Sequence, residues 1–170
     1  AAVGDEKEMS ITVGEAAPGT PLTANSIVPW MSNTKPMGAI AIGQLVSADE
    51  LDWDLPVVEV IPEFEAHGKS AITIKHILTH TAGLNGALES RPGEAKQSYE
   101  ESVARVSDHR VPDDWIFGET AAYDQYSSWY VVSEIVRRTT RQDYSDYVRH
   151  EILGRLDITS SWLTMTGAEF

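Results

Sequence analysis

The pattern of apolar and polar residues predicts a helix-rich chain with one short strand. Met37–Leu45 is apolar on nearly all sides, which is typical of a central, buried helix. Residues 98–106, 127–139 and 144–153 carry apolar residues at helical spacing and predict amphipathic helices. Met9–Val13 alternates weakly and predicts the strand. The side chains expected to point inward are Trp53, Leu55, Val57, Val103, Val106, Trp129, Val132, Ile135, Val136, Tyr147, Val148 and Ile152.

Glycine and proline mark the expected connections. Ala16–Asn25 contains two prolines and a glycine and is predicted to be a loop, whereas Val57–Ile61, between two prolines, predicts a short helical or extended turn. A helix is expected to begin after Thr73 and to be closed by Gly83 in a left-handed conformation. Inside the central apolar helix, glycines at positions 38 and 43 would let another element approach closely.

Composition narrows the functional classes. The 170 residues suit one domain or a large part of one, and 42% hydrophobic residues are enough to bury a sizeable core. The net charge of −13 argues against nucleic acid, whose phosphates need a basic surface. Cysteine is absent, which excludes disulfides and thiolate metal sites. No apolar run is long enough to span a bilayer.

The candidate chemistry begins in the heptapeptide Trp30-Met31-Ser32-Asn33-Thr34-Lys35-Pro36, directly before the central helix. Near a helix start, Ser32 and Lys35 would lie on one face, three residues apart. Ser32 or Thr34 could cap this helix, and Pro36 is tolerated near the first turn. A serine becomes nucleophilic when a base takes its proton, and free N–H groups at a helix start favour a developing oxyanion. Taken alone, the pair favours an ordinary helix start carrying an exposed lysine over a nucleophile with its base, so the case for chemistry depends on the other motifs.

The histidines do not predict a metal site. His76 and His80 are four residues apart, as metal ligands on a helix can be, but the zinc-protease pattern requires glutamate where Ile77 is found. We therefore expect no metal and no other cofactor. The three remaining histidines, His67, His109 and His150, are expected at the surface.

Several spaced motifs resemble the serine beta-lactamase-related family, and the resemblance extends from about Met9 to Met165. Its most distinctive linear block is Leu-Thr-His-Thr-Ala-Gly-Leu, at residues 78–84. For His80, within this block, the resemblance implies a structural role, as a hydrogen-bonding residue near the loop after Leu84. The remaining motifs are Ser32–Lys35, Leu51–Asp54 with Pro56, Tyr123–Arg138 and Tyr144–Ser161. The family includes class C beta-lactamases, D-alanyl-D-alanine carboxypeptidases, D-aminopeptidases, esterases and some acyltransferases.

The resemblance implies roles for individual residues. Ser32 would be acylated by a substrate carbonyl, with Lys35 and Tyr123 acting together as the general base. Tyr126 is the competing tyrosine, and Tyr123 is favoured by its spacing to the following helix. The family often has Tyr-x-Asn, whereas this chain has Tyr123-Asp124-Gln125, so Gln125 is the substitute that would contact substrate. Trp30 is a second candidate substrate-binding residue, although burial in the core explains it equally well.

The family fold implied is α/β, of the α+β type: an antiparallel sheet flanked by helices, together with a helical domain. We expect residues 1–170 to be a partial domain, divided into a strand and loop at 1–30, the nucleophile helix and following block at 31–83, and a helical region at 84–170. The family has a third motif, Lys-Thr-Gly or His-x-Gly, on a strand of the sheet beside the serine. No such tripeptide follows Tyr123 in this chain. Most of the sheet is thus expected outside this chain, from a missing segment or a second chain. The family usually has glycine where this chain has Arg141 and Asp157. The resemblance therefore implies either a left-handed backbone at these positions, at a cost of about 1 kcal/mol each, or a different local turn.

Three functions follow. The first is an acyl-serine hydrolase acting on a small ester, amide or peptide, as an esterase, D-aminopeptidase or beta-lactamase-like enzyme. The second is an acyltransferase that uses the same acyl-enzyme. The third is a non-catalytic member that binds a peptide or partner in the same pocket.

Overall fold

The computed structural model describes residues 11–89 and 97–167, and the chain divides into two compact units, residues 1–31 and 32–170. In the first unit, β1 (Glu15–Ala17) and β2 (Thr20–Pro21) form an antiparallel hairpin. Gly19, in the turn, adopts φ +78° and donates its N–H to the Glu15 carboxylate. The sequence prediction was wrong here: the strand begins beyond Val13 and runs into the expected loop, and the predicted Met9 and Ser10 lie outside the described residues.

The second unit is built from helices. Its α-helices are α1 (Lys35–Ser47), α2 (Ile74–Leu78), α3 (Tyr99–Ser107), α4 (Ser127–Thr140) and α5 (Tyr144–Tyr147). The 3₁₀ segments are η1 (Met31–Thr34), η2 (Val57–Glu59), η3 (Pro62–Ala71), which is interrupted by non-helical backbone at Ala66, His67 and Gly68, and η5 (Gly154–Leu156). A π-helix, η4 (Val148–Leu153), continues α5. The predicted helices are confirmed in position, and no described helix is long and apolar enough to cross a membrane.

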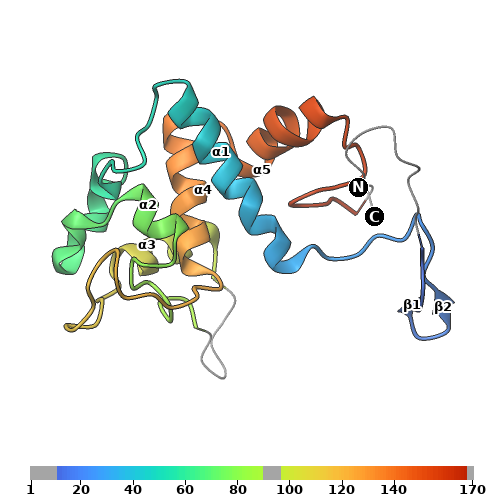
Figure 1. Cartoon of the computed structure of the whole chain (residues 1–170), viewed down its shortest axis with the longest axis horizontal. Coiled ribbons are helices and arrows are strands. Elements are labelled where there is room, and N and C mark those ends of the chain that lie inside the picture. The colour runs from blue at the N-terminus through green and yellow to red at the C-terminus, as the bar shows by residue number, and fades with distance from the viewer. Residues whose placement is uncertain (1–10, 90–96, 168–170) are drawn as a thin grey trace. The chain divides into compact units, whose positions relative to one another are not determined.

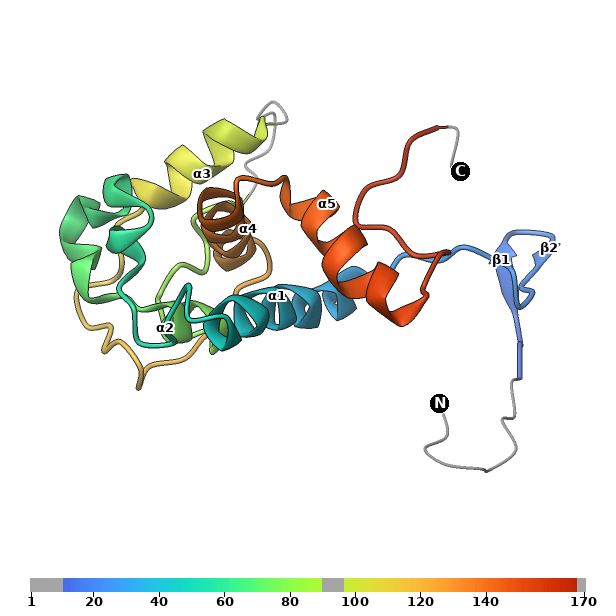
Figure 2. The same ribbon diagram turned by 90° about the horizontal axis from the view of Figure 1, so that it is seen from above.

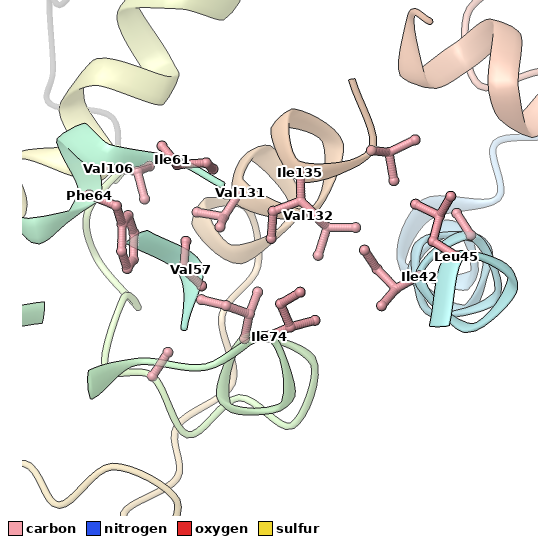
Figure 3. Close-up of a cluster of buried hydrophobic side chains, with 14 of the residues drawn as sticks. Ile42, Leu45, Val57, Ile61, Phe64, Ile74, Val106, Val131, Val132 and Ile135 are labelled. Atoms are coloured by element: carbon pink, nitrogen blue, oxygen red, sulfur yellow. The ribbon is translucent and has the colours of Figure 1, made fainter. Parts of the chain in front are cut away.

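Helix α4 lies at the centre of this unit. It packs against α1, α2, α3 and α5, as seen in Figures 1 and 2. The apolar face predicted for it is buried: Val132, Ile135 and Val136 have no exposed surface. Figure 3 shows that α4 contributes to a cluster shared with α1, α2 and the segment after α1. At an apolar-transfer energy of about 25 cal/mol per Å², each fully buried side chain of this size stabilises the fold by about 2 kcal/mol.

The close approach predicted at Gly38 is confirmed. A Cβ built on Gly38 would lie 3.0 Å from Val132 Cγ1 and 3.3 Å from a ring carbon of Trp129, both on α4. Gly43 has ordinary space, because the nearest atom to its virtual Cβ is 3.6 Å away, in Trp53. Glycine at position 38 thus sets the separation of α1 and α4, and with it the position of the N-terminal turn of α1.

Some local predictions were wrong. Trp53 is 41% exposed rather than buried, since it covers Gly43 from the solvent side. Thr34 occupies the N-cap position of α1 but makes no capping hydrogen bond, because η1 runs directly into α1 and keeps Thr34 in helical geometry. Gly83 is left-handed, as predicted, but α2 has already ended at Leu78. Of the two alternatives for Arg141 and Asp157, the structure shows the left-handed conformation, with φ 60° and φ 54°.

A buried lysine that the sequence did not reveal joins η3 to the end of α3. The Lys69 side chain has no exposed surface, and its Nζ donates to the carbonyls of Ser107 and His109, both at 2.8 Å, and of Ala66. The ammonium also lies 5.2 Å from the centre of the Phe64 ring. Burial lowers the pKa of Lys69 from its usual value. His109, expected at the surface, is half-buried, and burial lowers its pKa as well.

Candidate active site

The structure brings Ser32 and Lys35 together at the start of α1. Ser32 lies in the 3₁₀ turn η1 and Lys35 is the first residue of α1. Because side chains three residues apart nearly eclipse in a 3₁₀ turn, the lysine extends over the serine, and its Nζ donates to Ser32 Oγ at 3.2 Å. Ser32 is exposed and Lys35 is half-buried. The pair predicted from spacing alone is therefore in hydrogen-bond contact.

Tyr123 supplies a third polar group at the same point. Its phenolic oxygen donates to Ser32 Oγ at 2.7 Å, across 91 residues of sequence. Tyr126, the competing tyrosine, is the residue before the first turn of α4 and is 53% exposed, and no hydrogen bond joins it to Ser32 in the described structure. Of the two candidate tyrosines, Tyr123 is the one whose hydroxyl contacts Ser32.

Lysine and aromatic rings shape the electrostatics of this triad. Lys35 Nζ lies 5.1 Å from the centre of the Tyr123 ring and 5.4 Å from that of Trp129, within the range of cation–π attraction. Hydrogen bonds with Ser32 and Lys35, together with the lysine charge, lower the pKa of Tyr123 below its usual value of 10.0. A phenol with a lowered pKa gives up its proton more readily, which is what a base at this position needs.

The Leu78–Leu84 block packs beside Tyr123 and binds the backbone of its neighbours. His80 has a left-handed backbone (φ 59°), and its Nδ1 accepts the N–H of Asp124 at 3.0 Å. The carbonyl of Thr81 accepts the indole N–H of Trp115 at 3.0 Å. Gly83 is required because a Cβ there would lie 2.6 Å from Val111 Cγ1. The hydrogen bond expected of His80 is present, but it reaches the tyrosine motif rather than the loop after Leu84.

Asp124 belongs to the candidate site, and no role was assigned to it from the sequence. Its carboxylate, buried to 3% exposure, accepts the backbone N–H groups of Tyr126 (3.0 Å), Ser127 (2.8 Å) and Ser128 (2.7 Å). It also accepts the Ser128 hydroxyl at 2.7 Å. A carboxylate is favoured at a helix N-terminus by the free N–H groups and the helix dipole. An aspartate three residues before a predicted helix was the available signal.

The remaining candidates are placed as follows. Gln125 is exposed beside Tyr123, and Trp30 is half-buried in the first unit, so their substrate-binding roles stay predictions. His76 Nδ1 accepts the Thr73 N–H at 3.2 Å, within a capping box at the start of α2. Among residues 11–89 and 97–167, no group of three or more potential ligands is arranged to hold a metal.

The Ser32 site lies open to solvent. Tyr123 is 59% exposed, although the next residue, Asp124, is buried and hydrogen-bonded to the first turn of α4. A cavity of about 760 Å³ is found elsewhere, at the C-terminal half of α1, where Gln44, Glu50, Gln142 and Arg155 are among its lining residues. Ser32, Lys35 and Tyr123 do not line it. Within the described residues, Ser32 and Tyr123 are therefore exposed to solvent and do not lie in this cavity.

The helical fold and the Ser-Lys-Tyr arrangement are those expected of the serine beta-lactamase-related family, and comparison with known families agrees. The chain matches the Beta-lactamase family across residues 1–170 and belongs to that family. Its fold is the beta-lactamase/transpeptidase fold, here mostly helical with a two-stranded sheet. A penicillin-binding protein homologue from Caulobacter crescentus superposes with a TM-score of 0.79 at 26% identity, covering 92% of this chain and 42% of that one.

Two curated relatives are esterases by name. The Esterase/beta-lactamase LipL of Mycobacterium tuberculosis is 29% identical over 139 residues, which are 81% of this chain and 31% of that protein. Esterase EstB of Burkholderia gladioli is 39% identical over 70 residues, which are 39% of this chain and 18% of that protein. The chain thus spans less than a third of the length of the curated relatives it matches. A third relative, the acyltransferase calJ of Penicillium decumbens, is 34% identical over 80 residues, which are 38% of this chain and 19% of that protein. Together with the family match, these relatives place the chain in a family of serine hydrolases and acyltransferases.

Proposed function

We propose that the protein is a serine hydrolase that forms an acyl-enzyme at Ser32, with Lys35 and Tyr123 acting jointly as general base, on an ester or amide substrate. One observation carries the proposal: Ser32 Oγ is hydrogen-bonded to Lys35 Nζ at 3.2 Å and to Tyr123 OH at 2.7 Å. A non-catalytic binding module would have no need to hold a lysine and a phenol against one hydroxyl. The names of LipL and EstB support an ester as substrate.

Lys35 and Tyr123 share one proton in the reactive state. Either the lysine is an ammonium beside a phenolate, or it is a neutral amine beside a phenol, and the two arrangements differ only in where that proton lies. In both, one lone pair faces Ser32 and is free to accept the serine proton. The lowered pKa of Tyr123 supports the first arrangement.

Acylation then proceeds in two balanced steps. Ser32 Oγ forms a bond to the substrate carbonyl carbon while its proton passes to the Lys35–Tyr123 pair, giving a tetrahedral oxyanion. The carbonyl re-forms, the C–O or C–N bond of the substrate breaks, and the pair returns the proton to the departing alkoxide or amine. In deacylation, water attacks the acyl-serine, its proton passes to the pair, and Ser32 leaves with that proton.

The turn that carries Ser32 contributes to oxyanion stabilisation. The N–H groups in the first turns of a helix have no intrahelical acceptor, and the helix dipole places partial positive charge there. Ser32 lies in η1, which continues without interruption into the 13 residues of α1. A negative oxygen on a carbon bonded to Ser32 would therefore develop next to this positive end.

Covalent labelling of the complete protein tests the proposal. A fluorophosphonate probe should bond to Ser32 Oγ with loss of fluoride, and mass spectrometry of the peptide containing Ser32 should show the adduct. Ser32→Ala should abolish it. Ser47→Ala, which removes an exposed serine at the C-terminal end of α1, is the matched control and should label like the wild type.

A p-nitrophenyl ester provides the second readout. Release of p-nitrophenol should disappear in Ser32→Ala, and the products in water alone and with an added alcohol separate hydrolysis from acyl transfer. If the folded wild-type protein neither takes the label nor cleaves the ester, the hydrolase proposal is wrong and a binding function takes its place.

A further inference from the structure

The backbone on both sides of Tyr123 is fastened to one residue, His80. The N–H of Ala122 donates to the His80 carbonyl at 3.1 Å, and the N–H of Asp124 donates to His80 Nδ1 at 3.0 Å. The imidazole also packs against the tyrosine ring, with centroids 4.9 Å apart. Two hydrogen bonds and a ring contact from a single residue thus bracket the tyrosine.

Asp124 connects the same point to α4. Its carboxylate accepts the free N–H groups of the first turn, and its carbonyl accepts the indole N–H of Trp129 at 3.3 Å. The His80 ring meets Trp129 edge-on, with centroids 5.9 Å apart. Asp124 is thus held on one side by a helix terminus and on the other by an imidazole nitrogen. This arrangement leaves the Tyr123 backbone little freedom, although its side chain is exposed.

We propose that His80 is a positioning residue for Tyr123: its neutral imidazole accepts the Asp124 amide proton and thereby holds the tyrosine hydroxyl in contact with Ser32. This inference rests on the hydrolase function proposed above and names a further residue on which it depends. No hydrogen bond joins His80 to Ser32 in the described structure, so His80 acts through Tyr123 and not on the reacting atoms.

The protonation state of His80 determines whether the hydrogen bond exists. Nδ1 can accept the Asp124 N–H only when it carries no proton, which places the ring proton on Nε2. On protonation, Nδ1–H would face the Asp124 N–H, and two donors repel. The charged and titratable groups facing the ring are Asp124, Lys35 and Tyr123. Burial lowers the pKa of His80 from its usual 6.5. The charge of Asp124 opposes this effect, and the smaller effect of Lys35 adds to the lowering.

Two substitutions separate the hydrogen bond from backbone strain. The left-handed φ of 59° at position 80 is tolerated by both asparagine and glycine. The side-chain oxygen of an asparagine can take the place of Nδ1 as acceptor, whereas glycine removes it. In the complete protein, His80→Asn should therefore keep kcat for a p-nitrophenyl ester within about threefold, and His80→Gly should lower it by about 100-fold with KM nearly unchanged, as expected for a misplaced catalytic group.

The pH profile is a readout that a merely structural histidine would not change. Loss of the single Lys35–Tyr123 base makes log kcat fall with a slope of about 1 as pH decreases. In the wild type the slope should steepen to about 2 below the His80 pKa, because a second proton then disrupts the site. In His80→Asn the slope should stay near 1. Equal rates for wild type and His80→Gly, or a steepened slope that persists in His80→Asn, would overturn the positioning role while leaving the hydrolase function intact.

A measurement that needs no catalysis keeps the two proposals distinguishable. Nitrogen-15 NMR of the imidazole in the complete protein should show an unprotonated, hydrogen-bonded Nδ1 and a protonated Nε2 at neutral pH. The amides of Ala122 and Asp124 should be protected from exchange in the wild type, and Asp124 should lose protection in His80→Gly. A protonated Nδ1, or an unchanged Asp124 amide in the glycine variant, would refute the inference even if the protein proved inactive.

Discussion

The phenolic oxygen of Tyr123 lies 2.7 Å from Ser32 Oγ, although the two residues are 91 positions apart in sequence. The contact depends on three structural features: the 3₁₀ turn that presents Ser32, the packing of α1 on α4 at Gly38, and the anchoring of Asp124.

Replacing Tyr123 should have a much larger effect than replacing Tyr126. Tyr123→Phe removes the hydroxyl that contacts Ser32 but keeps the ring against His80 and Lys35, so folding should be preserved. Because a positioned base contributes about 10² to 10⁴ in rate, fluorophosphonate labelling of Ser32 should slow by at least about 100-fold. Tyr126→Phe removes the hydroxyl of an exposed tyrosine and should label like the wild type. Comparable losses in both variants would refute the assignment of Tyr123.

The acylation rate should rise with pH and reach a plateau below the ordinary tyrosine range. The reactive form of the Lys35–Tyr123 pair has lost a proton, so activity is lost as pH falls through the pKa of the pair. Contacts with Ser32 and Lys35 lower the pKa of Tyr123 from 10.0, so the midpoint in the wild type should lie below that value.

Lys35→Met tests the origin of this shift. The variant loses the cation and the hydrogen bond from Nζ, so the midpoint should move up toward 10.0, and the rate at pH 7 should drop by about 100-fold or more. Stopped-flow acylation by a p-nitrophenyl ester between pH 5 and about 10.5 measures both effects. An unchanged midpoint in Lys35→Met would show that the lysine does not tune the tyrosine.

Alanine at the two glycines of α1 should change stability in opposite directions. Gly38→Ala places a methyl group 3.0 Å from Val132 Cγ1, tighter than normal packing allows, and should lower the free energy of unfolding by about 1 to 3 kcal/mol. Gly43→Ala meets its nearest neighbour at 3.6 Å and should raise it by up to about 1 kcal/mol through helix propensity. Urea unfolding of both variants measures the difference. Equal effects would show that Gly38 does not set the α1–α4 distance.

The buried lysine should be essential for stability and dispensable for chemistry. Lys69→Met keeps the aliphatic volume but leaves the carbonyls of Ala66, Ser107 and His109 without their shared donor, which should cost at least about 2 kcal/mol. Lys75→Met is the matched control: Lys75 is 60% exposed and its ion pair with Asp54 is long, 3.8 Å, so the change should stay within about 0.5 kcal/mol. If the Lys69 variant unfolded at wild-type urea concentration, the cluster would have no net stabilising role.

The sequence alone determined those features, such as helix positions, that depend on residues close together in the chain. Helical spacing predicted α4 and the helical segment after it, because burial of one face repeats every 3.6 residues whatever the partner. The Ser32–Lys35 contact followed from spacing, since three residues in a helical turn bring side chains together. The family motif narrowed the backbone at Arg141 and Asp157 to two alternatives, left-handed or a different turn, because the helix ends there normally hold glycine.

Only the tertiary structure decided which distant groups meet. Tyr123 and Tyr126 are three positions apart, and no local rule selects between them. Tyr123 contacts Ser32, and the next residue, Asp124, anchors the backbone to α4 and His80. A structural hydrogen bond from His80 was expected, but its partner was not. Its Nδ1 accepts the Asp124 N–H only because the fold brings residues 80 and 124 together. Lys69 shows the reason most clearly: a charged side chain predicts exposure, and it is buried here only because carbonyls from two separate segments converge on it.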